Sequence, residues 1–262
     1  MVTLAKMRKC SSLFKCAEML QMFNVRQKLW SCWSHECCAE ELMDGGSVRG
    51  DTFSTAQLWC TESIHTTSTL SGNTVIQNAS NSAVGQAVIQ IAAALGLKTI
   101  NIIRDRENCD QLMQELQSLG ADYVVTEEEV MSSGLHQLFE EVPKPKLGLN
   151  CVGGLSGGLV LSNLDYGGTM VTYGGMAKRP LQIPAKSFIF HNVTLKGFWL
   201  TQWKRQHRTD KAKLTAMLDA VCELMRAGRL SAPNCVHTPF HQFTHALQAT
   251  TQTHSRKHVL IM

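Results

Sequence analysis

Six residues, SNSAVG at positions 80–85, have the types and the spacing of a phosphate-binding turn. A bound pyrophosphate needs close approach to the backbone, several N–H donors and the positive end of a helix dipole. Ser80 and Ser82 stand where the G-x-G-x-x-G pattern has its first two glycines, and Gly85 keeps the third, which lets a helix pack tightly on a strand. We expect the serine hydroxyls and the Asn81 amide to add donors. Small polar residues between a strand and a helix are also ordinary N-capping chemistry, so the turn alone leaves both interpretations open.

A second polar group, Arg104-Asp105-Arg106, ends the next apolar run. In a dinucleotide fold this place faces the adenosine ribose, where a carboxylate accepts from the 2′-OH of NAD and a basic side chain accommodates the 2′-phosphate of NADP. An isolated RDR would be explained as well by a solvated loop whose charges pair with one another. Its place after the second predicted strand favours a site for NADP.

Two glycine pairs follow later apolar runs, Gly153-Gly154 after LNCV and Gly174-Gly175 after MVTY. Ligands of such sheets bind outside the carboxyl ends of the strands, where backbone without side chains can approach a cofactor closely. Simple tight turns are the alternative explanation. Repetition at successive strand ends favours a cofactor.

No metal site or nucleophile motif is predicted. SCWSHECC brings together Cys32, His35, Cys37 and Cys38, but adjacent cysteines seldom reach one ion and no second pair follows at a suitable distance. We predict no Ser/His/Asp nucleophile either.

The elements that must position these residues alternate regularly from Gly72 onward. Short apolar, β-branched runs predict strands at 74–77, 98–103, 123–125, 147–152, 169–173 and 193–200. Helical spacing follows the first two, with Val84, Val88, Ile91, Ala92 and Leu95 before Gly96, and Leu112, Leu116 and Leu119 before Gly120. A longer helix is predicted at 210–227 and a last strand at 258–262. The pattern predicts a doubly wound parallel sheet of the Rossmann type, an α/β fold covered by helices on both faces.

Composition excludes several classes of protein. The 262 residues carry 25 Lys and Arg against 21 Asp and Glu, without the long single-sign block typical of nucleic-acid binding, so we expect no nucleic-acid partner. No apolar stretch approaches the length of about 20 residues that a membrane span needs. Outside the first sixty residues only four cysteines occur, and we interpret them as small core residues in a reducing compartment: Cys109, Cys151, Cys222 and Cys235.

The first 71 residues lack sustained periodicity, and we expect a poorly ordered segment there. Residues 1–34 are basic and contain a single acid, Glu18. A mitochondrial transit peptide and an irregular tail explain this composition equally.

Four stretches together resemble the mitochondrial trans-2-enoyl-CoA (enoyl-ACP) reductases of the zinc-independent medium-chain dehydrogenase/reductase family. They are VIQNASNSAVGQAVIQIAAALGLKTINIIRDR, LNCVGG, GGTMVTYGGMAK and LKGFWLTQWK. The likeness runs from Gly72 to Met262. It implies a mitochondrial, NADPH-dependent oxidoreductase of fatty-acid synthesis that delivers hydride to a 2-enoyl thioester of CoA or ACP, and a homodimer formed through the nucleotide-domain sheet.

The resemblance also implies where the cofactor binds. The pyrophosphate turn corresponds to Asn81, Ser82, Ala83 and Val84, and the adenosine phosphate to Arg104, Asp105 and Arg106. The nicotinamide end corresponds to Tyr173, Gly174, Gly175 and Met176, and to Phe198, Trp199 and Leu200. Lys257 matches a further cofactor-binding lysine.

The sequence departs from this family at two points. Family members usually have SNSGVG, so Ala83 is a mild difference. In the family a β-rich catalytic domain with a proton-donating tyrosine precedes the first nucleotide-binding strand, whereas here Tyr123, Tyr166 and Tyr173 are the only tyrosines and no catalytic residue is assigned. We therefore divide the chain into an atypical segment 1–71, an NADP-binding domain 72–228 and an incomplete remnant of the catalytic domain at 229–262.

Two interpretations of the function stay open at this point. The first is an enoyl thioester reductase, whose activity is in question because the substrate domain has no counterpart. The second is a non-catalytic NADPH-binding remnant or partner of the full-length enzyme. A quinone reductase of the same broad fold is a weaker alternative.

Overall fold

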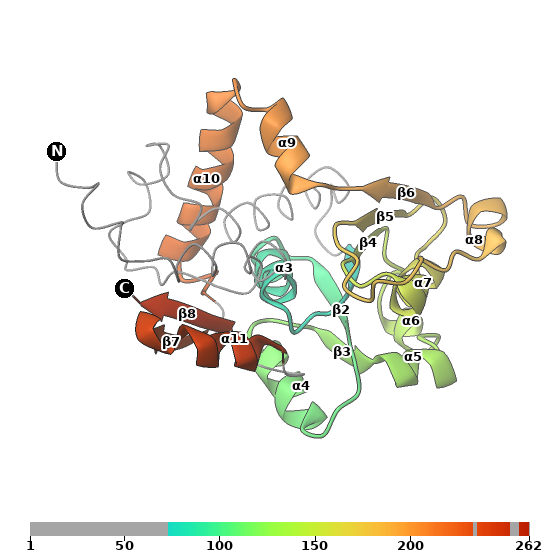
Figure 1. Cartoon of the computed structure of the whole chain (residues 1–262). Helices are drawn as coiled ribbons and strands as arrows, with labels where there is room; N and C mark the ends of the chain where they lie inside the picture. Colours follow the sequence, from blue (N-terminus) through green and yellow to red (C-terminus); the bar gives the residue numbers. More distant parts are fainter. Residues whose placement is uncertain (1–72, 233–234, 252–256, 262) are drawn as a thin grey trace. The chain divides into compact units, whose positions relative to one another are not determined.

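The structure, a computed structural model, describes residues 73–232, 235–251 and 257–261 (Figure 1). These residues belong to two units, which we describe separately: a larger one that ends at Pro233, and a smaller C-terminal one. The predictions for residues 1–71, including SCWSHECC and the basic segment, lie outside the described residues. The domain boundaries proposed from the sequence stay predictions.

The larger unit is built on a six-stranded sheet in the order β3-β2-β1-β4-β5-β6, with every neighbouring pair parallel. The strands are β1 (Thr74–Asn78), β2 (Lys98–Ile103), β3 (Tyr123–Thr126), β4 (Leu147–Asn150), β5 (Thr169–Thr172) and β6 (Thr194–Gly197). The predicted doubly wound α/β fold is confirmed. The strand order reverses between β1 and β4, the place where such sheets bind ligands.

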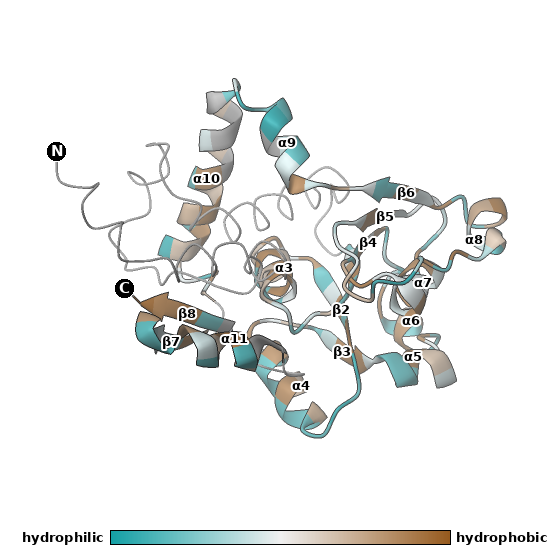
Figure 2. Ribbon diagram, in the orientation of Figure 1, coloured by the Kyte–Doolittle hydropathy of each residue, from teal (hydrophilic) through white to brown (hydrophobic). Residues whose placement is uncertain are grey.

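Helices connect the strands and cover both faces of the sheet. They are α3 (Ala83–Ala94), α4 (Cys109–Ser118), α5 (Glu127–Ser132), α6 (Leu138–Glu141), α7 (Gly154–Ser162), α8 (Ala185–Ile189), α9 (Leu200–Gln206) and α10 (Lys211–Arg226). Helix α3 is apolar along most of its length, whereas α9 is largely hydrophilic (Figure 2). Within the described ranges, no helix is both long and apolar enough to cross a membrane.

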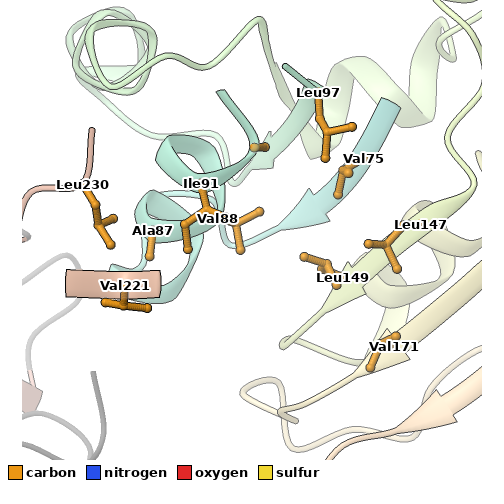
Figure 3. Packing of buried hydrophobic residues seen from close by; sticks show 11 residues of the cluster. Val75, Ala87, Val88, Ile91, Leu97, Leu147, Leu149, Val171, Val221 and Leu230 are labelled. Carbon is orange, nitrogen blue, oxygen red and sulfur yellow. The ribbon is translucent and has the colours of Figure 1, made fainter. Parts of the chain in front are cut away.

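The core lies on the two faces of the sheet. On one face, side chains of β1, β4 and β5 pack against α3, and Val221 of α10 and Leu230 complete the cluster (Figure 3). On the other face, Ile76, Ile100 and Met170 pack against α5, α6 and α7. Both faces of the central strands β1, β2 and β4 are therefore buried, which explains why their sequences are continuous runs without alternation.

Three predicted strands are shorter than expected, 169–173 by its last residue only. The two larger differences have a physical reason. The run 193–200 ends as a strand at Gly197, where pairing with β5 ends, and Leu200 already begins α9. The run 147–152 ends at Asn150, because the next three N–H groups donate to side chains and do not continue the ladder. The short helices α5 to α8 were not predicted, although α5 begins with a capping box of Thr126 and Glu129.

The prediction that the four later cysteines are core residues is fully confirmed for Cys151 alone, although Cys109 packs against a core cluster around Ile89 and Ile103. Cys151 is buried, but Cys109, Cys222 and Cys235 are only half-buried. Burial raises the pKa of the Cys151 thiol, and it raises that of the Cys109 thiol as well. Such thiols stay protonated and unreactive near neutral pH.

The C-terminal unit consists of two parallel strands and the helix between them. Its elements are β7 (Cys235–Pro239), the 3-10 turn η3 (Phe240–Gln242), α11 (Phe243–Thr251) and β8 (Lys257–Ile261). Ala246 and Val259 are buried, and the Nδ1 atom of buried His258 lies 2.8 Å from the Thr238 hydroxyl. The predicted last strand corresponds to β8, which begins one residue earlier.

Candidate functional site

The parallel sheet brings most of the predicted site residues to one edge. The turn at 80–85 follows β1, the RDR group follows β2, and the Tyr173–Met176 loop follows β5. The Tyr173 N–H donates to the Asn150 carbonyl at 2.9 Å, and the Phe198 N–H donates to the Thr172 carbonyl at 2.9 Å, so the chain beyond each strand is still tied to the sheet. Carboxyl ends of parallel strands meet at the same edge, which is where these folds bind ligands.

The N-terminus of α3 presents free backbone donors. Ser82 is the N-cap, and its Oγ accepts from the Gly85 N–H at 3.1 Å. Within the described part of the chain, the N–H groups of Ala83 and Val84 have no acceptor. Two free N–H groups at the positive end of a twelve-residue helix are donors that an anion could accept from.

Gly85 is required by the close packing of α3 on β1, as predicted. A Cβ atom at this position would lie 2.6 Å from both the Cα and the carbonyl oxygen of Ser80. These are backbone atoms, which cannot move aside without moving the turn. The third glycine of the pattern therefore holds the helix N-terminus close to the end of the strand.

We expected the hydroxyls of both Ser80 and Ser82 to donate to a bound phosphate, and this expectation is wrong for Ser80. This residue is fully buried, and its hydroxyl lies 3.2 Å from the Ile102 carbonyl and 3.4 Å from the Gln77 carbonyl. Its single proton is therefore donated within the protein. The Ser80 hydroxyl links the turn by hydrogen bonds to carbonyls of β1 and β2. The Ser82 hydroxyl caps the helix.

The RDR group does not pair its own charges. Arg104 and Asp105 are exposed and Arg106 is half-buried, and Asp105 accepts from the Arg106 backbone N–H at 2.9 Å. Among the described residues, neither guanidinium forms an ion pair. The Nε of Arg106 is buried without a partner, and burial together with the neighbouring Arg104 charge lowers the pKa of Arg106. An anion between the two side chains would relieve this repulsion.

The four glycines of the two pairs are not required for the same reason. Gly153 and Gly154 have φ angles of 78° and 54°, which favour glycine whether or not a ligand is present. A Cβ on Gly174 would lie 2.9 Å from the Cys151 carbonyl, so this glycine lets one loop approach the other. Only Gly175 has open space where its side chain would be. It is the glycine of the four that a cofactor can approach freely.

The remaining predicted residues lie in varied surroundings. Phe198 packs partly buried against the α3 core, and exposed Trp199 has the Arg205 guanidinium 5.6 Å from its ring centroid. Met176 is 65% exposed beside the Tyr173 loop. Lys257 is the first residue of β8, in the separate C-terminal unit.

Buried amide side chains along the strand ends were missed by the sequence analysis. Gln77, Asn78, Asn101 and Asn150 are all fully buried, and they bond to one another and to loop N–H groups. Polar residues inside apolar runs such as TVIQN and LGLN were the available signal. A buried amide needs partners, and here the partners lie on neighbouring strands.

The site therefore combines a helix N-terminus, two unpaired guanidiniums and an open glycine at one sheet edge, the parts of a dinucleotide site. The family model described as zinc-binding dehydrogenase matches residues 83–219. The chain belongs to the zinc-binding dehydrogenase family. In the described residues of this family member, no group of three or more His, Cys, Asp or Glu side chains is arranged to hold a metal ion.

Relatives within this family are named mitochondrial enoyl-[acyl-carrier-protein] reductases. The protein from Xenopus tropicalis is 52% identical over 193 residues, which are 73% of this chain and 55% of the relative. The protein from Homo sapiens is 50% identical over 192 residues, which are 73% of this chain and 51% of the relative. The chain spans about half the length of the curated relatives it matches.

Solved structures agree with these relatives. The mitochondrial 2-enoyl thioester reductase Etr1p/Etr2p heterodimer from Candida tropicalis has a TM-score of 0.69 at 29% identity, over 77% of this chain and 58% of that one. The complex of Etr1p with NADP and crotonyl-CoA has a TM-score of 0.68 at 31% identity, with the same coverage of 77% and 58%. A quinone reductase from Bacillus thuringiensis, at 18% identity and a TM-score of 0.61 over 78% of this chain and 60% of that one, shows a likeness of fold alone. The resemblance inferred from the sequence motifs is confirmed.

Proposed function

We propose that the larger unit binds NADPH and forms the cofactor half of a mitochondrial reductase of 2-enoyl thioesters. The observation that carries this proposal is the pair Arg104 and Arg106, whose guanidiniums have no acidic partner in the described residues and follow β2 at the edge where α3 begins. A 2′-phosphate supplies the dianion that such a pair lacks, whereas the 2′-hydroxyl of NADH does not.

The other predicted segments fit the remaining parts of the cofactor. Asn81, Ser82, Ala83 and Val84 would receive the pyrophosphate at the α3 N-terminus. Tyr173 to Met176 and Phe198 to Leu200 would lie toward the nicotinamide, with open space at Gly175. Lys257 is proposed to bind the cofactor on the strength of the family pattern. When bound, NADPH supplies the hydride of the reduction.

The substrate class rests on the relatives. Those of about half identity are named enoyl-[acyl-carrier-protein] reductases, and the Etr1p complex contains NADP and crotonyl-CoA. Reduction of an enoyl thioester adds hydride to the β-carbon and a proton to the α-carbon, so a proton donor must lie beside the substrate. We assign no residue of this chain to that step. A mitochondrial location is proposed because the relatives are named mitochondrial, and imaging of a fluorescent fusion tests it.

Cofactor preference is the first test of this proposal. In a fluorescence titration the chain is expected to bind NADPH more tightly than NADH. Arg106→Gln should raise the Kd for NADPH about 10- to 100-fold and change that for NADH less than about twofold, because only NADPH offers a charged partner. Arg226→Gln, at the exposed end of α10, is the matched control and should change neither value. Equal affinities of the unaltered chain for the two cofactors would sink the proposal.

A second candidate function is a chain that binds NADPH without turnover of its own. It is favoured by the position of the tyrosines, since Tyr123, Tyr166 and Tyr173 all lie in the nucleotide-binding unit. We therefore expect purified chain to oxidise NADPH negligibly with crotonyl-CoA. Oxidation at the rate of a full-length relative assayed in parallel would eliminate this second candidate.

We also propose that two copies associate through the β6 edge. Within the described residues β6 pairs with β5 alone, and nearby Phe188, Ile189 and Phe190 are 45%, 70% and 71% exposed. An unpaired edge strand beside exposed apolar side chains is typical of an interface. Light scattering should give the mass of a dimer for the unaltered chain and that of a monomer for Ile189→Glu. A monomer in both cases would contradict the proposal.

A further inference from the structure

The Asn150 side chain at the end of β4 gathers three donors. Its Oδ1 accepts from the N–H of Val152 at 3.2 Å, from the N–H of Gly153 at 3.0 Å and from Asn78 Nδ2 at 2.8 Å. Its Nδ2 donates to the Thr172 hydroxyl at 3.0 Å. The side chain thus connects the ends of β1, β4 and β5, and it holds the first turn after β4.

Asn78, the last residue of β1, completes this arrangement. Its Oδ1 accepts from the Cys151 N–H at 3.0 Å, and its Nδ2 reaches the Ser156 hydroxyl at 3.2 Å as well as Asn150. The backbone N–H groups of residues 151, 152 and 153 are therefore all bonded to these two side chains. Asn78 also stands directly before the turn that carries the α3 N-terminus.

The restraint passes on to the loop after β5. The Met176 N–H donates to the Cys151 carbonyl at 3.0 Å, and the Ala177 N–H donates to the Val152 carbonyl at 2.9 Å. The Tyr173–Met176 loop is thus held by the backbone of the segment that Asn78 and Asn150 hold.

Burial prevents water from replacing these hydrogen bonds. Asn78 and Asn150 have no exposed surface, so water cannot replace a lost partner. Gly157 provides the room, because a Cβ there would lie 3.1 Å from Asn150 Nδ2. A side chain without an acceptor at position 150 would leave N–H groups of the 152–153 turn unsatisfied, and the turn would shift to find water.

We infer that Asn78 and Asn150 are positioning residues for the nicotinamide end of the cofactor, acting through the 151–153 turn on the Tyr173–Met176 loop. This inference rests on the proposed NADPH site. It separates the site into two halves: the adenosine half, held by the turn after β1 and the RDR group, and the nicotinamide half, held through the two asparagines. Removing the Asn150 amide should weaken only the second half.

The test compares two ligands on Asn150→Leu, which keeps the approximate size of the side chain and removes its acceptor. NADPH contains both halves, whereas 2′,5′-ADP carries the adenosine and its phosphates but no nicotinamide. For Asn150→Leu we expect the Kd for NADPH to rise about tenfold, the equivalent of one positioned contact, and that for 2′,5′-ADP to change less than about twofold. Thr172→Val removes only the acceptor of Asn150 Nδ2, and it should raise the Kd for NADPH about threefold while leaving that for 2′,5′-ADP nearly unchanged. This milder variant keeps the test valid if Asn150→Leu fails to fold.

Asn101→Leu is the matched control. Asn101 is equally buried, but it accepts from Gln77 and donates to Thr99 and the Tyr123 carbonyl, all within the sheet. It should leave the ratio of the two affinities unchanged. The inference is overturned if the Asn150 and Thr172 variants bind NADPH as the unaltered chain does, or if they weaken both ligands equally. If the unaltered chain binds neither NADPH nor 2′,5′-ADP, the proposed NADPH site itself is overturned.

Discussion

At the scale of single residues, Gly85 and Gly175 are glycines for different reasons. Replacing each by alanine should therefore change the free energy of unfolding by different amounts. Gly85→Ala is expected to destabilise the fold by about 3 kcal/mol, because its Cβ would overlap backbone atoms of Ser80. Gly175→Ala meets nothing within 4 Å and should change the free energy of unfolding by less than about 0.5 kcal/mol.

The two variants are measured by urea unfolding and by NADPH titration. Gly175→Ala should weaken NADPH binding despite its unchanged stability, because the open space beside it would be needed by the cofactor. Full retention of affinity in this stable variant would argue against placing the cofactor at the Tyr173–Met176 loop.

Ala79 is a strained residue between β1 and the phosphate turn. Its φ of 49° is a left-handed conformation that costs a non-glycine residue about 1 kcal/mol. Ala79→Gly should therefore raise the free energy of unfolding by up to about 0.5 kcal/mol after the added chain entropy of glycine. Ala94→Gly, in the last turn of α3, is the control and should lower it by about 1 kcal/mol. The same sign in both variants would contradict the strain at Ala79.

At the scale of elements, one ion pair ties the loop before β4 to the loop before β5. Lys146 Nζ lies 2.8 Å from Asp165 Oδ2, and the hydrogen bond from Lys146 lowers the pKa of Asp165. A carboxyl with a lowered pKa in the folded state contributes stability above its unfolded pKa of about 3.9, and this contribution is lost as pH falls through the folded pKa.

Asp165→Asn tests this pair, since an amide keeps an oxygen for the Tyr166 N–H and loses the charge. Both partners are more than a third exposed, so we expect a loss of only about 0.5 kcal/mol at neutral pH. The difference between variant and unaltered chain should shrink as the pH falls below about 3.9, as followed by denaturant unfolding at each pH. A difference that persisted at low pH would show that the charge is not its cause.

At the scale of the whole molecule, the two units differ in how completely their strands are paired. β1 and β4 each have a parallel neighbour on both sides, and their residues are buried. β7 and β8 pair with each other alone within the described residues, and a two-stranded sheet is marginal without further partners. Amide hydrogen exchange should therefore be slowest in β1 and β4 and clearly faster in β7 and β8. Equal protection in the two units would mean that β7 and β8 have partners beyond those described.

Much of the larger unit could be predicted because its signals are local. Burial on both sides makes each strand a continuous apolar run, and helical spacing and terminal glycines mark α3, α4 and α10. The short helices were missed because fewer than ten residues carry too little periodicity. In the candidate site, the turn at 80–85 and the RDR group could be predicted, because each follows its own strand directly in the chain.

The sequence by itself determined the strands and the longer helices α3, α4 and α10 of the larger unit, and therefore that a phosphate turn and a basic group stand at strand ends. Only the tertiary structure decided which groups in those segments are free. The Ser80 hydroxyl donates to the Ile102 carbonyl of β2 and so is not available to a ligand. The two guanidiniums of RDR have no acidic partner among the described residues. Asn78 met Asn150, 72 positions away, because β1 and β4 are neighbours where the strand order reverses. Such bonds depend on which strands lie side by side, and no local pattern carries that information.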